Sequence, residues 1–181
     1  MKKPILTIIV LLFYTFTFSQ EKRVEEVYQE CLYNSLSDKG IVLKKYAKGF
    51  EDYLIESKIL ENNSPKSYYK LLKSISEGKR YNSSFKYSFI DSINKIEKQK
   101  IIPFNLDCYN KMLKLKKFKK SKFYKIQLLI AQNEKLYDNY NYNNTLKKMA
   151  SILDPGDFDM DYYKQRIYVF LYFSNILYEQ D

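Results

Sequence analysis

An all-α fold is predicted by three properties of this 181-residue chain. Hydrophobic residues make up 45% of it, and 19 Tyr and 12 Phe supply much of the material for a core. Only four Gly and four Pro are present, whereas β-sandwiches need many turns rich in these residues. Apolar residues recur every three to four positions, as in amphipathic helices. We expect a single irregular bundle of about seven or eight helices after an N-terminal signal peptide.

The first element expected is a secretory signal peptide over residues 1–19. A charged start precedes the apolar run 5–18, and small residues stand near the predicted cleavage between Ser19 and Gln20. The alternative is a retained membrane anchor, which needs about 20 apolar residues. Cleavage would leave one helical domain, residues 20–181, without a transmembrane segment. We expect this domain to be exported to the periplasm, the cell surface or the medium.

Three helices with apolar stripes on one face are expected next. The first ends near Gly40, and the third is the clearest, because Ser64 and Pro65 form a cap and a first-turn proline and Gly78 ends it. The stripes are Val24, Val27, Tyr28, Cys31 and Ser35 in the first helix, Leu43, Tyr46, Ala47, Phe50 and Leu54 in the second, and Tyr68, Leu71, Leu72 and Ile75 in the third.

Five further helices complete the predicted bundle. The fourth must end before Pro103, since residues that precede proline avoid the helical region, and Asn105 can cap the fifth. The seventh runs from Thr145 to Leu153, after the turn-prone segment 138–144. The eighth is so apolar that we expect it at the centre. The stripes are Phe85, Phe89, Ile93 and Ile96 in the fourth helix, Cys108, Met112 and Leu115 in the fifth, Phe123, Ile126, Ile130 and Tyr137 in the sixth, and Tyr163, Ile167, Phe170, Ser174 and Leu177 in the eighth.

The two cysteines, Cys31 and Cys108, allow two interpretations. Export would place them in an oxidising compartment, where they could form a disulfide. On the chain-entropy model, closing so long a loop stabilises a fold by about 4.5 kcal/mol. Alternatively, both are buried thiols that behave as small hydrophobic side chains. The sequence leaves both possibilities open.

A run of lysines is the strongest charge feature of the chain. No acidic residue occurs between Cys108 and Asn133, and the lysines there would spread around a helical wheel, so we expect a helix break over residues 116–121. Aromatic residues interleave with these lysines. The candidate binding region comprises Lys111, Lys114, Lys116, Lys117, Phe118, Lys119, Lys120, Lys122, Phe123, Tyr124 and Lys125.

Such a region favours an anionic partner, which we expect to be an unidentified protein or an envelope polymer or lipid headgroup. Concentrated positive charge attracts all three, and aromatic rings can settle at a headgroup boundary. Nucleic acid is disfavoured, because arginine, which binds phosphate with two parallel hydrogen bonds, is nearly absent. The alternative is a solvated loop without a partner.

Composition excludes several kinds of catalysis. The chain has no His and no Trp, which removes Ser-His-Asp and Cys-His catalysis and His-ligated zinc or haem. Its scattered glycines form no phosphate-binding loop. We predict neither a cofactor nor a metal. The aspartates at 154, 157, 159 and 161 do not fit a calcium loop, since counting from Asp157 puts Tyr162 and Tyr168 where such a loop needs Gly and Glu. We expect instead that Asp157 or Asp159 caps the final helix and that Asp161 lies favourably near its positive end.

The function predicted is therefore that of a non-enzymatic binding module. Its candidate catalytic carboxylates are expected on polar, solvated helix faces: Glu25, Glu26, Glu51 and Asp52. Two alternatives remain. One is an exported hydrolase that uses carboxylates, or a serine with a lysine as base. The other is a cell-surface structural subunit that assembles through its tyrosine-rich surface.

Overall fold

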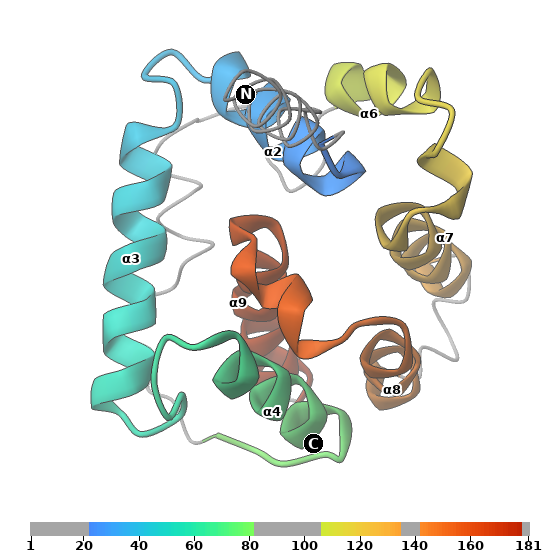
Figure 1. The fold of residues 1–181 in the computed structure, drawn as a ribbon. Helices are drawn as coiled ribbons and strands as arrows, with labels where there is room; N and C mark the ends of the chain where they lie inside the picture. The colour runs from blue at the N-terminus through green and yellow to red at the C-terminus, as the bar shows by residue number, and fades with distance from the viewer. Residues whose placement is uncertain (1–21, 82–105, 135–141, 179–181) are drawn as a thin grey trace, which may run out of the picture.

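The computed structural model describes residues 22–81, 106–134 and 142–178, and in these ranges it is an all-α bundle without strands (Figure 1). The predicted signal peptide and fourth helix lie outside them. None of the helices described has the length and hydropathy needed to cross a membrane. The elements are α2 (Val24–Ser35), α3 (Ile41–Glu56), α4 (Pro65–Ser76), α6 (Leu106–Leu113), η1 (Phe118–Lys120), α7 (Lys122–Glu134), α8 (Tyr142–Ile152), η3 (Pro155–Asp159) and α9 (Asp161–Tyr178), where η marks a 3-10 helix.

Helix α9 lies at the centre of the bundle, with the other helices around it (Figure 1). Its residues Tyr163, Ile167 and Leu171 are at most 1% exposed, which confirms the predicted central position of the final helix. Helices α2 and α4 and the η3 segment all contact it. Buried side chains from every helix described join in the core around α9.

Helix α4 follows its local sequence signals closely. The Ser64 hydroxyl accepts a hydrogen bond from the Ser67 amide (3.3 Å), and Pro65 occupies the first turn. Gly78 follows the helix with φ of +85°, a left-handed conformation that favours glycine. The predicted stripe is buried, which confirms this helix: Tyr68, Leu71, Leu72 and Ile75.

Helix α2 forms where the first helix was predicted but ends at Ser35, and its buried face differs from the predicted one. Val24 and Tyr28 are buried as expected, whereas Ser35 is exposed. The buried arc extends instead to Glu25 and Leu32, because polar partners from α7 and α9 satisfy the Glu25 carboxylate. Apolar spacing alone therefore misplaced the inner face.

The prediction that the first helix ends near Gly40 is wrong. Gly40 instead directly precedes the first residue of α3. Its φ is +78°, and a Cβ at this position would lie 2.4 Å from Cδ1 of Tyr33. Only glycine fits such a close approach without moving the tyrosine ring. The turn between α2 and α3 therefore depends on this residue.

The aspartates that precede α9 differ from their predicted roles. Asp154 accepts a hydrogen bond from the Gly156 amide (2.9 Å), and Asp157 accepts one from the Asp154 amide (2.8 Å). These contacts cap the 3-10 helix η3 rather than α9, because Pro155 starts a separate turn of helix. Helix α8 likewise begins at Tyr142, three residues before the predicted start, so part of the segment 138–144 is helical.

A disulfide joins Cys31 of α2 to Cys108 of α6, with an S–S distance of 2.08 Å. The two residues are 77 positions apart, so the bridge closes a long loop and stabilises the fold by about 4.5 kcal/mol on the chain-entropy model. Helix α6 leads into the lysine-rich segment. The bridge therefore holds one end of that segment against α2.

Candidate functional site: the lysine-rich bend

Residues 111–125, which we call the lysine-rich bend, connect α6 to α7 through the 3-10 turn η1. Helix α6 ends at Leu113, and the amides of Leu115 and Phe118 then bond to carbonyls three residues earlier, at 2.9 Å each. The Ser121 hydroxyl accepts from the Tyr124 amide (3.1 Å) at the start of α7. The predicted helix break over residues 116–121 is confirmed.

Two of the three aromatic residues in the bend belong to the hydrophobic core. Phe118 is 1% exposed and Phe123 is fully buried. Phe123 packs against Tyr28 of α2, with ring centroids 4.8 Å apart. Tyr124 is half-buried and lies edge-on to Phe118 at 5.1 Å. Both phenylalanines therefore hold the bend from inside and present no ring to a partner.

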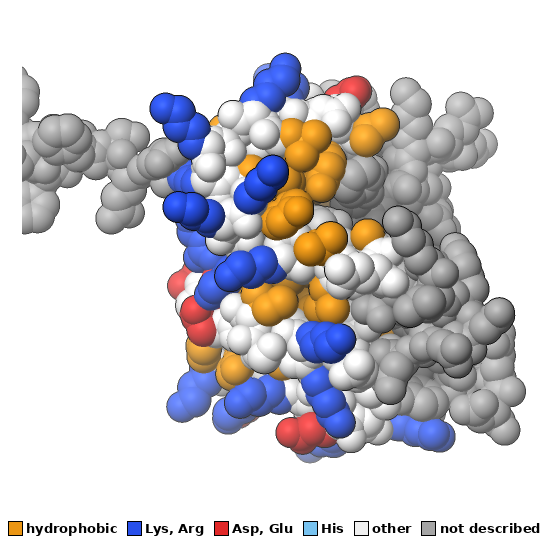
Figure 2. Space-filling model, turned by 90° about the vertical axis from the view of Figure 1, so that its right-hand side faces the viewer, with side chains coloured by type: hydrophobic (Ala, Val, Ile, Leu, Met, Phe, Trp, Pro, Cys, Tyr) orange, Lys and Arg blue, Asp and Glu red, His pale blue; other side chains and the backbone are white. Residues whose placement is uncertain are grey.

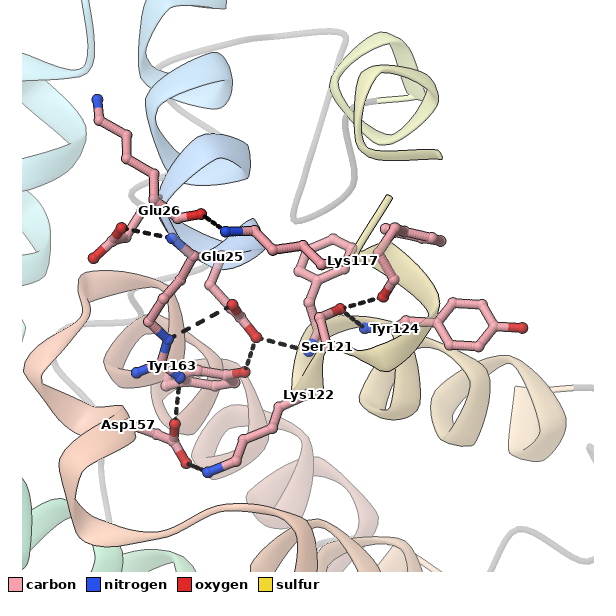
Figure 3. A network of polar contacts seen from close by, with 12 residues as sticks. Glu25, Glu26, Lys117, Ser121, Lys122, Tyr124, Asp157 and Tyr163 are labelled. Atoms are coloured by element: carbon pink, nitrogen blue, oxygen red, sulfur yellow. Dashed lines mark hydrogen bonds and ion pairs between the residues drawn. The ribbon is translucent and has the colours of Figure 1, made fainter. Parts of the chain in front are cut away.

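Lys122 pairs with the buried Asp157 (Figure 3) and with the exposed Asp154. Its Nζ atom lies 2.5 Å from Asp154 and 2.7 Å from Asp157. Asp157 is 1% exposed and also pairs with Arg23 at 2.5 Å. Partial burial opposes the charge of Lys122, but the hydrogen bonds to Asp154 and Asp157 raise its pKa overall. The bond from Lys122 is the largest cause that lowers the pKa of Asp154.

Glu25 completes this inner network, and its expected exposure was wrong. The side chain is 3% exposed. One carboxylate oxygen accepts from the Phe123 amide (2.8 Å) and from the Tyr163 hydroxyl (2.7 Å) (Figure 3). Burial and the negative charge of Glu25 raise the pKa of Tyr163. Because the Phe123 amide lies in the first turn of α7, Glu25 also offsets the positive end of that helix dipole.

Six lysines of the bend point away from this network and are exposed. Lys117 differs from them, since its Nζ atom donates to the Lys22 carbonyl (Figure 3). The acids nearest the inner side, Asp154 and Asp157, already pair with Lys122. The outer side is therefore a concentration of positive charge, and the bend itself contains no acidic residue. The exposed members are Lys111, Lys114, Lys116, Lys119, Lys120 and Lys125.

A second group of polar residues lines a cleft of about 100 Å³ between α3 and α9. Glu51 at this cleft is 7% exposed, which contradicts its expected solvation. It accepts from Tyr68 (2.6 Å) and from Lys48 (3.0 Å), and Tyr68 contacts the hydroxyl of Tyr168 at 2.6 Å. Burial raises the pKa of both tyrosines. Asp161 also lines the cleft.

Sequence reasoning missed the inner network because its members are far apart in the chain. Arg23 and Asp157 are separated by 134 residues, and Glu25 and Tyr163 by 138. The one signal available was the position of Glu25 beside the apolar stripe of the first helix. Within the ranges described, no three His, Cys, Asp or Glu side chains converge as a metal site would require.

Comparison of the chain with protein-family models, with curated proteins and with solved structures finds no match. The functional inference therefore depends on the geometry and charge of the bend.

Proposed function

We propose that this chain is an exported, non-enzymatic binding protein that contacts an anionic partner through the outer side of the lysine-rich bend. The observation that carries this proposal is the division of the bend into an anchored inner side and a charged outer side. Six exposed lysines occupy a segment without any acidic residue. Their mutual repulsion stabilises nothing in the fold, whereas an anionic partner would relieve it.

The anchoring supports a binding role because it holds the charges in place. Phe118 and Phe123 pack in the core, Lys122 is paired with the buried Asp157, and the disulfide fixes the preceding helix. A fixed array of lysines loses less conformational freedom on binding than a mobile loop does. This arrangement favours binding over a merely solubilising role for the lysines.

The test is binding of the full chain to inorganic polyphosphate, measured by titration at increasing salt. We expect an affinity that falls steeply as salt rises, since each lysine–phosphate contact releases counterions. The triple charge reversal Lys116→Glu, Lys119→Glu and Lys120→Glu should abolish binding and leave the helical circular dichroism spectrum unchanged. Unchanged affinity in that variant would remove the bend as the site.

One observation favours a hydrolase as a second candidate: Glu51 and Asp161 line the same cleft between α3 and α9. Paired carboxylates are the machinery of many glycoside hydrolases. Each of these two already accepts hydrogen bonds, Glu51 from Tyr68 and Asp161 from Tyr33. Hydrolysis of an envelope glycan that is lost in Glu51→Gln, at unchanged melting temperature, would support this candidate. Retained activity would eliminate Glu51 as a catalytic residue.

A further inference from the structure

Exposed leucines accompany the lysines on the outer face of α6 and α7. Leu106 and Leu113 of α6 are 62% and 52% exposed, and Leu128 of α7 is 45% exposed. Figure 2 shows a band of hydrophobic side chains on this side of the molecule, with lysines and arginines beside and between them. Isolated leucines on a surface are ordinary, but a patch bordered by charge marks an interaction site.

The leucines of the two helices belong to one surface because an aromatic bridge connects them. Leu106, Tyr109 and Leu113 share a face of α6, since residues three and four apart lie on one side of a helix. Tyr124 and Leu128 share a face of α7 for the same reason. The bridge consists of Tyr109, Phe118 and Tyr124.

The contacts within this bridge are close. The Tyr109 ring lies 5.6 Å from Phe118, which in turn lies 5.1 Å from Tyr124. Burial and the neighbouring Tyr124 raise the pKa of Tyr109. The leucines and the half-buried Tyr109 and Tyr124 therefore form an apolar strip across α6 and α7, which the buried ring of Phe118 supports from inside.

We propose that the anionic partner of the bend is the surface of a lipid bilayer. This inference rests on the function proposed above and names its partner class. Leu106, Leu113 and Leu128 enter the headgroup region, and the surrounding lysines contact lipid phosphates while their alkyl stems lie along the strip.

Charge composition favours a bilayer over a protein partner. Protein interfaces are enriched in arginine and depleted in lysine, whereas all basic residues between Cys108 and Asn133 are lysines. A lipid surface requires no fixed hydrogen-bond geometry, so the mobile point charge of lysine suits it. A soluble polyanion would use the lysines, but it would gain nothing from the leucines. The apolar strip thus distinguishes a bilayer from a polymer.

The experiment compares full-length variants in co-sedimentation with vesicles of phosphatidylcholine that contain roughly 30% phosphatidylglycerol. All variants carry the same N-terminal segment, so its contribution to binding is common to them. We expect Leu113→Ser/Leu128→Ser to lower the vesicle partition coefficient about tenfold, by losing apolar burial. Lys116→Gln/Lys119→Gln should lower it about 25-fold, since each lysine near an anionic surface contributes about fivefold.

Matched controls place the same changes on other faces. Lys45→Gln/Lys66→Gln removes the same charge from α3 and α4, and Ile41→Ser removes an apolar side chain that is 70% exposed. Both should bind vesicles like the unmodified chain. Thermal unfolding by circular dichroism checks that every variant is folded.

Inorganic polyphosphate separates failure of this inference from failure of the proposed function. The leucine variant should keep full affinity for polyphosphate and lose vesicle binding, whereas the lysine variant should lose both. If the leucine variant binds vesicles normally, or the chain binds polyphosphate but not vesicles, the bilayer inference is overturned and the proposed function stands. If the lysine variant matches its control with both probes, both proposals fail.

Discussion

Lys122 and Lys125 are three residues apart in one helix and have opposite surroundings. Lys122 pairs with Asp154 and with Asp157, which is 1% exposed, and its pKa is raised. Lys125 lies one turn further along α7 and is exposed. The same contrast holds for the whole bend, whose inner side is a network of buried acids and whose outer side carries lysines and leucines.

This comparison shows that charge density along a sequence says little about which charges are available to a partner. A run of lysines is a property of the chain, whereas availability depends on the acids that tertiary packing brings to each lysine. The inner lysine contributes to the fold, and we propose that the outer ones serve binding. Variants that act on one side only can break this distinction or sharpen it.

The largest effect is expected from Glu25→Ala on the inner side. Truncation leaves the Phe123 amide and the Tyr163 hydroxyl without their acceptor and leaves Arg23 near a cavity. Removing one partner from a buried ionic network typically costs about 3–5 kcal/mol. We expect the free energy of unfolding, measured by urea denaturation, to fall by this amount.

Glu30→Ala on the same helix is the matched control for this loss. Glu30 is exposed and pairs only with exposed Lys22 among the contacts described, and such surface pairs contribute about 0–1 kcal/mol. Equal losses in the two variants would contradict the assignment of Glu25 to a stabilising inner network.

How much of the molecule could be predicted from sequence follows the same division between local and distant contacts. Helix α4 was predictable because its cap, its first-turn proline and its apolar stripe lie within 15 residues of each other. The helix break in the bend was predictable because lysines on every side of a helix leave no face to bury. The burial of Glu25 was not, since its partners Phe123 and Tyr163 are 98 and 138 residues away.

The outer side of the bend could be predicted only in part, because the burial of its residues also depends on distant contacts. Composition identified the lysines as a group, but it could not separate Lys122 from the exposed members, nor place Phe118 and Phe123 inside. Periodicity favoured apolar residues for the core, so the exposed leucines were not recognised as candidates. Placing them needed the arrangement of α6 against α7.

The next effect concerns alkaline pH and the buried tyrosines. Burial raises the pKa values of Tyr68, Tyr163 and Tyr168 in the folded chain, whereas in the unfolded chain tyrosine ionises near pH 10. Their stabilisation is therefore complete below about pH 10 and is lost as the pH rises above it. We expect the free energy of unfolding to fall by about 1.4 kcal/mol per pH unit for each tyrosine.

Urea denaturation between pH 8 and pH 11 measures how the free energy of unfolding changes with pH. Above about pH 10, Tyr168→Phe should reduce this slope by about 1.4 kcal/mol per pH unit, the contribution of one tyrosine. A slope that is the same in Tyr168→Phe would mean that this hydroxyl is accessible to solvent. The cleft between α3 and α9 would then be wetter than the contacts indicate.

The smallest pair of effects comes from the two lysines themselves. Lys122→Met keeps the length and apolar character of the side chain but removes the charge that faces Asp157, which is left with Arg23 as its remaining cation. Leaving a buried carboxylate with fewer partners costs about 1–3 kcal/mol. Lys125→Met makes the same chemical change on the exposed side, where substitutions fall within about 0.5 kcal/mol. We expect a lower melting temperature for Lys122→Met alone and, at low salt, weaker polyphosphate binding for Lys125→Met alone. The reverse assignment would show that pairing with Asp154 and Asp157 does not decide the role of a lysine in this bend.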